Sequence, residues 1–137
     1  MSKGISEKLG VKKNMRIYLM NTPEDFEEKV QLPEVDLKTR LAGEFDYIHF
    51  FVITQKDFNT TFPKLKKYLG KKGMLWVSWP KSKQQNTDLE IKKVIELGYN
   101  HGLVESKAIS IDETWSAIKF THPINGKEYN NSYGKLK

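Results

Sequence analysis

The chain of 137 residues fits one domain with a core of its own. Because it has no cysteine, a disulfide framework, a thiolate nucleophile and a cysteine metal site are all excluded. The formal net charge of +6 comes almost wholly from lysine, since the only arginines are Arg16 and Arg40. No run approaches the roughly 20 apolar residues that cross a bilayer, and residues 1–14 lack the apolar stretch of a signal peptide. We therefore expect a cytoplasmic protein with no membrane partner.

The first predicted elements are a strand over residues 15–20 and a short helix over 23–30. The strand segment, MRIYLM, is largely apolar. Thr22 is a good helix N-cap, and the proline that follows it suits the first helical position. The next segment, 31–44, contains proline and glycine and could form one more helical turn or a covering loop.

A central strand is predicted over residues 46–53 (DYIHFFVI), which is apolar on both alternating faces, as expected of a strand covered on both sides. Thr54, with Asp57 three residues on, is expected to cap the helix that follows. Gly70 and Gly73 are expected to end this helix. It would place four apolar side chains on one side: Phe58, Phe62, Leu65 and Leu69.

The remaining predicted elements are a third strand, a third helix and a terminal hairpin. Residues 74–79 (MLWVSW) predict the strand. Thr87 and Glu90 have the spacing of a capping box for the helix that follows. Two strands, over residues 103–109 and 114–121, then predict an antiparallel hairpin.

This order of elements, β-α-β-α-β-α-β-β, predicts an α/β fold in three layers. We expect a Rossmann-like sandwich of about five strands, mostly parallel, with a C-terminal antiparallel β-hairpin. Residues 1–121 are assigned to a single domain. Residues 122–137 are polar and are expected to form a flexible tail.

Three segments resemble the second half of class I S-adenosylmethionine-dependent methyltransferases. They are Phe45-Asp46 before the central strand, the stretch 69–77 (LGKKGMLWV), and the terminal hairpin. In that family an FD strand, an LK-x-GG-x-L strand and a β-hairpin close the sheet. The resemblance implies a truncated methyltransferase-like fold.

A more specific resemblance is to a bacterial family known as domain of unknown function 3052. It rests on residues 76–81 (WVSWPK), Thr87-Asp88 and residues 112–117 (DETWSA), and it covers residues 5–121. The family has no established activity, so the resemblance implies a fold and little more.

The segment after the first strand departs from the methyltransferase pattern. A cofactor loop needs glycines there so that the backbone can approach the ligand closely, but residues 19–25 (LMNTPED) contain none. About 25 residues separate the first strand from the central one, too few for the two further βα units of a full methyltransferase. In that family one of those units supplies the acidic residue that holds the ribose. We therefore expect no cofactor, S-adenosylmethionine included.

The carboxyl ends of three predicted strands place polar and aromatic residues at one edge of the sheet, where ligands of open α/β proteins gather. Hydroxyl, amide, indole and ammonium groups beside helix N-termini suit an anion or a planar ligand. The alternative is that these residues serve as helix caps, as a structural turn and as core packing. The candidate ligand-binding residues are Asn21, Thr22, Thr54, Ser78, Trp79 and Lys81.

The lysines between residues 64 and 93 form the main excess of positive charge, opposed there only by Asp88 and Glu90. Such a cluster could bind a polyanion such as nucleic acid by counterion release. The alternative is a solvated surface, which the scarcity of arginine favours. The lysines of this group are Lys64, Lys66, Lys67, Lys71, Lys72, Lys81, Lys83, Lys92 and Lys93.

No constellation of catalytic residues is visible in the sequence. The three histidines have no metal-binding spacing, and His49, inside an apolar strand, is expected to be a satisfied core histidine. Ser78 and Ser116 lack the glycine-flanked elbow of a hydrolase. The acidic pair Asp112-Glu113 fits a hairpin turn. We expect no catalytic residue and no metal site.

These observations leave three functional hypotheses. The first is a non-enzymatic binding or regulatory domain on a degenerate methyltransferase-like scaffold, which holds a small anionic ligand or a protein at the carboxyl edge of the sheet. The second is a nucleic-acid-associated protein that uses the lysines, and the third is a residual transferase. Because the first strand is expected at an edge of the sheet, a homodimer could also form.

Overall fold

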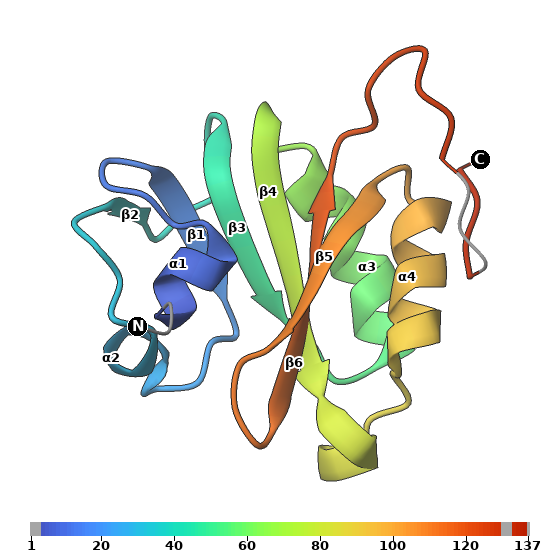
Figure 1. The fold of residues 1–137 in the computed structure, drawn as a ribbon, viewed down its shortest axis with the longest axis horizontal. Coiled ribbons are helices and arrows are strands. Elements are labelled where there is room, and N and C mark those ends of the chain that lie inside the picture. The colour runs from blue at the N-terminus through green and yellow to red at the C-terminus, as the bar shows by residue number, and fades with distance from the viewer. Residues whose placement is uncertain (1–3, 130–132, 137) are drawn as a thin grey trace.

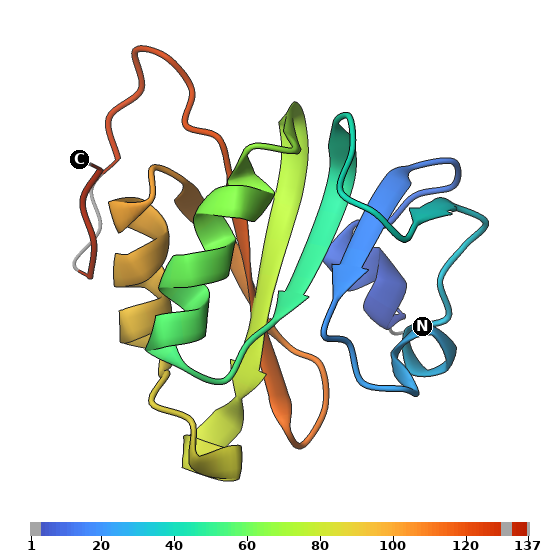
Figure 2. The ribbon, with the colours of Figure 1, turned by 180° about the vertical axis from the view of Figure 1, so that it is seen from behind.

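One six-stranded sheet, with strand order β2-β1-β3-β4-β6-β5, organises the molecule (Figures 1 and 2). It is seen in a computed structural model that describes residues 4–129 and 133–136. The strands β1 to β4 run parallel, and β6 is antiparallel to both β4 and β5. The predicted Rossmann-like α/β fold and its antiparallel C-terminal hairpin are confirmed. The strands are β1 (Arg16–Met20), β2 (Asp36–Lys38), β3 (Phe45–Phe51), β4 (Leu69–Pro80), β5 (Val104–Ser110) and β6 (Trp115–Thr121).

Helices cover both faces of the sheet, which makes three layers (Figures 1 and 2). On one face, Leu9 and Phe26 pack with Tyr47 and Trp76 of the sheet. On the other face, Phe58 and Phe62 belong to the larger core cluster. The helices of the first face are α1 (Ile5–Leu9) and α2 (Phe26–Val30), and those of the second are α3 (Gln55–Lys66) and α4 (Ile91–Asn100), with a 3₁₀ segment, η1 (Lys81–Asn86), before α4.

The strand β2 is an addition to the predicted sheet, and it corrects two expectations. It pairs in parallel with β1, with Arg16 opposite Asp36 and Tyr18 opposite Lys38. The segment 31–44 is therefore not a helical turn or a covering loop throughout, and β1 is not an edge strand. None of the three β2 residues is buried, so the alternation that signals a strand is absent from the sequence. The homodimer was inferred from a bare β1 edge, and this reason no longer holds, although the homodimer itself stays a prediction.

The strand β4 is longer than predicted because the chain leaves α3 early. The helix ends at Lys66, and Leu69 begins the strand instead of extending the apolar side of the helix. A bulge then separates the Phe45–Leu69 pairing from the rest of the β3–β4 ladder. Gly73 is needed there, since a Cβ on it would lie 2.7 Å from the carbonyl oxygen of Phe45. The glycines therefore shape the strand and do not end the helix.

The helix α1 was not predicted, although its signals are present in the sequence. Ile5 and Leu9 are four residues apart, and Gly10 ends the helix in the left-handed conformation, with φ 81°. The carbonyl of Leu9 accepts a hydrogen bond of 2.9 Å from Trp76 Nε1. A buried tryptophan of the central sheet therefore holds this short helix in place.

The C-terminal segment, in the part that the structure describes, lies beside α4 without forming a helix or strand (Figure 1). His122 Nε2 contacts the carbonyl of Leu69 at 3.1 Å, and Tyr129 packs against the larger core cluster. Lys92 lies over the Tyr133 ring, 5.5 Å from its centroid. The flexible tail stays a prediction. Among the described residues, no helix has the length and apolar character to cross a membrane.

Candidate functional site

Two neighbouring strands, β1 and β3, mark the point where the chain reverses its direction of winding across the sheet. From β1 the chain crosses to β2 on one side, and from β3 it crosses to β4 on the other. Ligands of open α/β sheets bind outside the carboxyl ends of the strands at such a point. We call the residues that follow β1 and β3 here the switch-point edge: Asn21, Thr22, Thr54 and Gln55.

Three of the four residues of the switch-point edge form hydrogen bonds within the chain, whereas the Thr22 hydroxyl has no partner among the described residues. Asn21, in the left-handed conformation with φ 58°, donates from Nδ2 to the carbonyl of Phe51 at 3.4 Å. Thr54 caps α3 as predicted, since its Oγ1 accepts from the Asp57 N–H at 3.1 Å. Gln55 N–H donates to Asp88 Oδ1, and Gln55 Nε2 donates to the Asp88 carbonyl, both at 2.8 Å. A carboxylate of the protein therefore occupies the anion-binding position at the α3 N-terminus.

Thr22 does not cap α2. The helix begins at Phe26, with Asp25 at the N-cap position and no side-chain cap. The proline after Thr22 lies in the turn between β1 and the helix and not at the first helical position. The helix expected over 23–30 begins three residues later than predicted, because the loop after β1 extends to Asp25.

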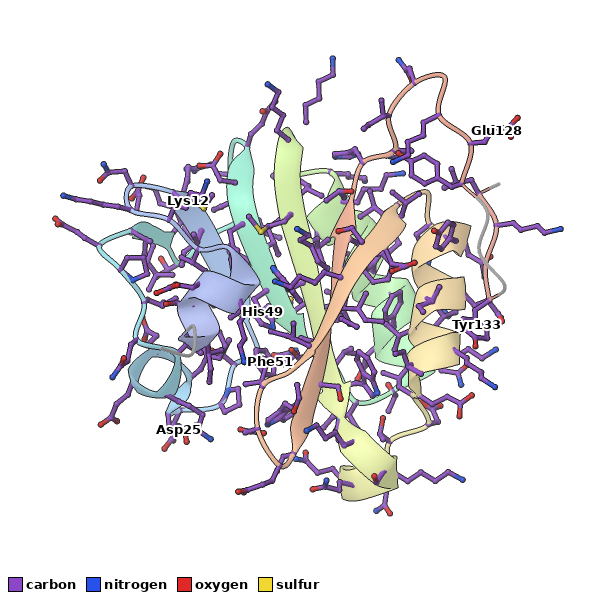
Figure 3. The ribbon with its side chains drawn as sticks, in the orientation of Figure 1. Lys12, Asp25, His49, Phe51, Glu128 and Tyr133 are labelled. Atoms are coloured by element: carbon purple, nitrogen blue, oxygen red, sulfur yellow. The ribbon has the colours of Figure 1, made fainter. Side chains whose placement is uncertain are left out.

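A buried polar chain lies beneath the switch-point edge, on the face covered by α1 and α2. Tyr47 Oη contacts His49 Nδ1 at 2.8 Å, and His49 Nε2 contacts Ser78 Oγ at 2.7 Å. Phe26 meets the His49 ring edge-on at 5.1 Å, and Phe51 stacks on it at 4.6 Å. Figure 3 labels His49 and Phe51. The side chains of Tyr47, His49 and Ser78 are all excluded from solvent.

The environment of His49 favours its neutral form. Burial lowers the pKa of His49 to about 3 and raises the pKa of Tyr47 well above its usual value. A neutral imidazole can donate at one nitrogen and accept at the other, which satisfies both neighbours. With no exposed surface on His49 or Ser78, the group cannot reach a substrate. The prediction of a satisfied core histidine is confirmed.

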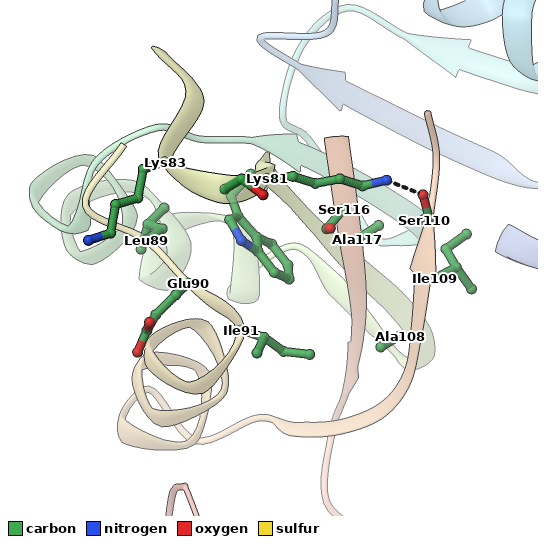
Figure 4. A pocket seen from close by; sticks show the side chains of 12 residues that line it. Lys81, Lys83, Leu89, Glu90, Ile91, Ala108, Ile109, Ser110, Ser116 and Ala117 are labelled. Atoms are coloured by element: carbon green, nitrogen blue, oxygen red, sulfur yellow. Dashed lines mark hydrogen bonds between the residues drawn. The ribbon is translucent and has the colours of Figure 1, made fainter. Parts of the chain in front are cut away.

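A pocket of about 560 Å³ opens at the carboxyl end of β4, between α4 and the β5–β6 hairpin (Figure 4). This volume lies within the range of small-molecule sites. Aliphatic side chains and an indole form much of the lining, and two lysines, a glutamate and serines add polar groups. We call it the β4 pocket, lined by Trp79, Lys81, Ser82, Lys83, Leu89, Glu90, Ile91, Ala108, Ile109, Ser110, Ser116 and Ala117.

Lysines without a carboxylate partner distinguish the β4 pocket from the switch-point edge. Lys81 Nζ donates to Ser110 Oγ, a neutral acceptor (Figure 4). Among the described residues, neither Lys81 nor Lys83 has a carboxylate within 4.0 Å. The helix α4 begins at Ile91 with no side-chain hydrogen bond from its N-cap, Glu90. The pocket thus has two lysines and one glutamate, Glu90, at its wall and an uncapped helix N-terminus beside it.

Trp79 lies in the wall of the pocket and also belongs to the core. Its side chain is 4% exposed, and its indole N–H has no acceptor among the described residues. No fully buried side-chain nitrogen in this part of the chain lacks a partner, so the Trp79 nitrogen retains some accessible surface. The Trp79 side chain is among those that line the pocket. The two predicted roles of Trp79, core packing and ligand contact, are compatible.

The structure divides the six candidate ligand-binding residues between two places and the core. Trp79 and Lys81 lie together in the β4 pocket. Asn21, Thr22 and Thr54 follow β1 and β3 at the switch-point edge, and Ser78 is fully buried beneath it. Sequence reasoning missed the other half of the pocket wall, from Ala108 to Ser110 and from Ser116 to Ala117. The predicted hairpin was the signal, since it places these segments side by side.

The predicted capping box before α4 is not formed. Thr87 Oγ1 donates to the carbonyl of Ile53 and accepts from the Leu89 N–H at 3.1 Å. The helix begins one turn later than the box requires. Thr87 therefore joins the loop after β3 to the loop before α4, while Asp88 caps α3.

The lysines of the 64–93 group do not form one patch. Lys71 and Lys72 lie near the start of β4, and Lys81 follows its end, so roughly 30 Å of strand separates them. Lys66 Nζ donates to the carbonyl of His101 at 2.8 Å, and Lys93 pairs with Glu96 at 2.9 Å. Polyanion binding by the whole group stays a prediction.

Two further titratable residues have structural partners. Asp112 Oδ1 accepts from the N–H groups of Thr114 and Trp115, both at 2.8 Å, as expected of a hairpin turn. Burial acts to raise the pKa of Asp112, but the hydrogen bonds from Lys29 and the backbone lower it overall. Burial and the nearby Lys66 lower the pKa of His101, so a positive charge at the end of α4 is not favoured. No group of three histidine or acidic side chains fit to hold a metal occurs in the described part of the chain.

Several similar solved structures are methyltransferases. A TehB-like SAM-dependent methyltransferase from Corynebacterium glutamicum aligns over 89% of this chain and 89% of its own, with TM-score 0.58 and 10% identity. Magnesium protoporphyrin IX methyltransferase (ChlM) from Synechocystis, with bound SAH, aligns over 87% and 81%, with TM-score 0.60 and 7% identity. The 1,6-didemethyltoxoflavin-N1-methyltransferase from Burkholderia thailandensis aligns over 85% and 73%, with TM-score 0.59 and 11% identity. At these identities the likeness establishes the fold alone.

No protein-family model and no curated protein matches the chain. The fold is methyltransferase-like, as the resemblance implied. Membership of the domain of unknown function 3052 family stays a prediction.

Proposed function

We propose that the protein is a non-enzymatic binding domain on a methyltransferase-like scaffold, and that it holds a small anionic ligand in the β4 pocket. The observation that carries the proposal is the contrast in free donors. At the pocket, the Trp79 N–H and the Lys83 ammonium have no partner among the described residues, and Lys81 has only a neutral one. At the switch-point edge, Asn21 and Gln55 bond to the protein itself.

The backbone of the pocket rim supports a binding role. In η1, Ser82 and Lys83 both line the pocket, and both adopt left-handed conformations with φ 51° and 62°. Such residues are strained, and strain of this kind is concentrated at ligand sites and switch regions. A ligand that contacts this rim would offset part of that cost.

A thermal-shift screen tests the proposal, because a ligand that binds only the native state raises the melting temperature. The screen contains small carboxylic acids, phosphate esters, alcohols and amines. We expect anionic members to stabilise the protein. Ala108→Trp should abolish this effect, since Ala108 is exposed and lines the pocket, whereas Ser106→Trp on the same strand lies outside it and should not. Stabilisation that survives Ala108→Trp, or none by any member, would contradict the proposal.

A residual transferase is the second candidate, and the fold favours it. Two of the similar methyltransferases are described with S-adenosylhomocysteine bound. Against it stands the turn after β1, where Asn21 bridges to Phe51 and no glycine lets the backbone approach a nucleoside. Calorimetric titration with S-adenosylmethionine and S-adenosylhomocysteine separates the candidates. Binding that Asn21→Trp abolishes and Ala108→Trp leaves intact would favour the transferase.

A further inference from the structure

The β4 pocket combines an apolar floor with donors at its wall, and this combination constrains the ligand. Trp79 and Leu89 are buried, and Ile91 at the rim is 47% exposed. An exposed isoleucine beside a buried apolar floor is suited to cover apolar surface of a ligand. A bare inorganic anion would leave this floor in contact with water.

The donors lie close together in sequence, since Trp79 is near the end of β4 and Lys81 is the first residue of η1. Trp79 and Lys81 are two residues apart, and both line the pocket. The indole N–H is a directional donor in a side chain that is 4% exposed, and the ammonium adds a full charge next to it. Lys81 is only half-buried, and its contact with Ser110 is to a hydroxyl, so it can exchange this partner for a charged one.

The N-terminus of α4 adds to the preference for negative charge. This ten-residue helix begins at Ile91, which lines the pocket, and the side chain of Glu90 does not cap it. The uncapped N–H groups of its first turn favour an anion nearby. The unpartnered indole N–H of Trp79 is an independent feature that indicates an acceptor in the same pocket.

We propose, on the basis of the binding function above, that the ligand is an amphipathic anion: a molecule with one carboxylate or phosphate group on an apolar body. The apolar body lies against the floor of the β4 pocket. The anionic group accepts from the Trp79 N–H and pairs with Lys81 in place of Ser110.

Isothermal titration with a matched probe series tests this assignment. The probes are 3-phenylpropanoate, 2-phenylethyl phosphate, 3-phenylpropan-1-ol with the same body and no charge, and acetate as the head group alone. We expect both amphipathic anions to bind about tenfold more tightly than the alcohol, as a charge-assisted hydrogen bond implies. Acetate should not bind measurably. The two anionic probes distinguish a carboxylate ligand from a phosphate ester.

Variants locate the anionic group. Lys81→Gln should weaken binding of 3-phenylpropanoate about tenfold, and Trp79→Phe, which removes the N–H together with the five-membered ring, about fivefold. Lys71→Gln makes the same change of charge at the far end of β4 and should leave affinity unchanged. Lys81→Gln should not alter the affinity for the alcohol.

The possible failures are distinguishable. If the alcohol and the acid bind equally and Ala108→Trp blocks both, the pocket is a ligand site but the preference for an anion is refuted. If no probe binds, or if Ala108→Trp blocks none of them, the proposed function fails together with this inference.

Discussion

The switch-point edge and the β4 pocket both lie at the carboxyl ends of the parallel strands, but they differ in what their polar groups contact. At the switch-point edge, Asn21 donates to Phe51, and Gln55 donates twice to Asp88. At the β4 pocket, the Trp79 N–H and Lys83 have no partner among the described residues. A methyltransferase-like fold usually implies a ligand at the first of these places. In this chain the lysines without a carboxylate partner are at the second.

The difference teaches that a fold and its ligand site can be separated. The fold of this chain, with its six-stranded sheet, is similar to that of solved methyltransferases. The hydrogen bonds at the carboxyl ends of β1 and β3, however, are formed within the chain and stabilise the fold. Function has to be argued from the site and not from the fold.

The largest effect is expected from acid, through the polar chain that lies beneath the switch-point edge. His49 has a pKa of about 3 in the folded protein and 6.5 as an ordinary histidine. Below pH 6.5 the unfolded chain takes up a proton that the folded protein excludes, so stability falls as the pH falls towards 3. The loss is about 1.4 kcal/mol for each pH unit in this window.

Urea unfolding at pH 7, 6 and 5 measures this loss. His49→Gln should be less stable at pH 7 but should lose much less stability on acidification. His101 has a lowered pKa as well, so His101→Gln serves as the matched control and should retain most of the wild-type slope. An unchanged slope in His49→Gln would show that the histidine is not held neutral.

A second comparison is between the two buried tryptophans of β4. Trp76 Nε1 donates to the carbonyl of Leu9, whereas the Trp79 N–H has no acceptor among the described residues. Trp76→Phe should lower the free energy of unfolding by about 3 kcal/mol, since it leaves a cavity and a buried carbonyl without its donor. Trp79→Phe should cost about 1 kcal/mol, because no hydrogen bond is lost. Chemical denaturation of both variants checks this order, and equal losses would contradict it.

Replacing Asn21 should have a smaller effect on stability, and its size should depend on the residue introduced. Asn21→Ala places a side chain with a Cβ and no local hydrogen bond at φ 58°, and should destabilise the protein by about 1.5 kcal/mol. Asn21→Gly removes the same amide but tolerates the conformation, so it should be the more stable of the two. Thermal unfolding of the pair checks the order. A glycine variant less stable than the alanine variant would mean that the amide contact outweighs the backbone.

The smallest effect concerns the carboxylate that occupies the α3 N-terminus. Asp88→Ala removes the acceptor of the Gln55 N–H and should cost about 1 kcal/mol. Asp88→Asn keeps an acceptor and should cost less. Denaturant titration of the two variants gives the difference, and no loss in Asp88→Ala would imply that solvent replaces the carboxylate without cost.

The sequence predicted the fold well where apolar residues are numerous and regular. The runs that form β3 and β4, and the turn residues of the terminal hairpin, led directly to the Rossmann-like sheet. It did not reveal β2, because none of its residues is buried. Thr87 and Thr22 look like helix caps in sequence, but the bonds that Thr87 makes depend on a loop more than 30 residues away.

The candidate site was predicted in part for a similar reason. Trp79 and Lys81 were identified because they end a strand, and strand ends are visible in a sequence. The rest of the pocket depends on the left-handed backbone of η1 and on the packing of α4 against the hairpin. The residues of η1 include no glycine to signal such a conformation.

The most direct test of the shifted ligand site uses the indole N–H signals of the three tryptophans in a two-dimensional proton–nitrogen NMR spectrum. Titration with 3-phenylpropanoate should move the Trp79 indole signal and leave those of Trp76 and of the Asn21 and Thr22 backbone in place. Titration with S-adenosylhomocysteine should leave all of them unchanged. Movement at Asn21 and Thr22 with S-adenosylhomocysteine, and none at Trp79 with the acid, would contradict the account.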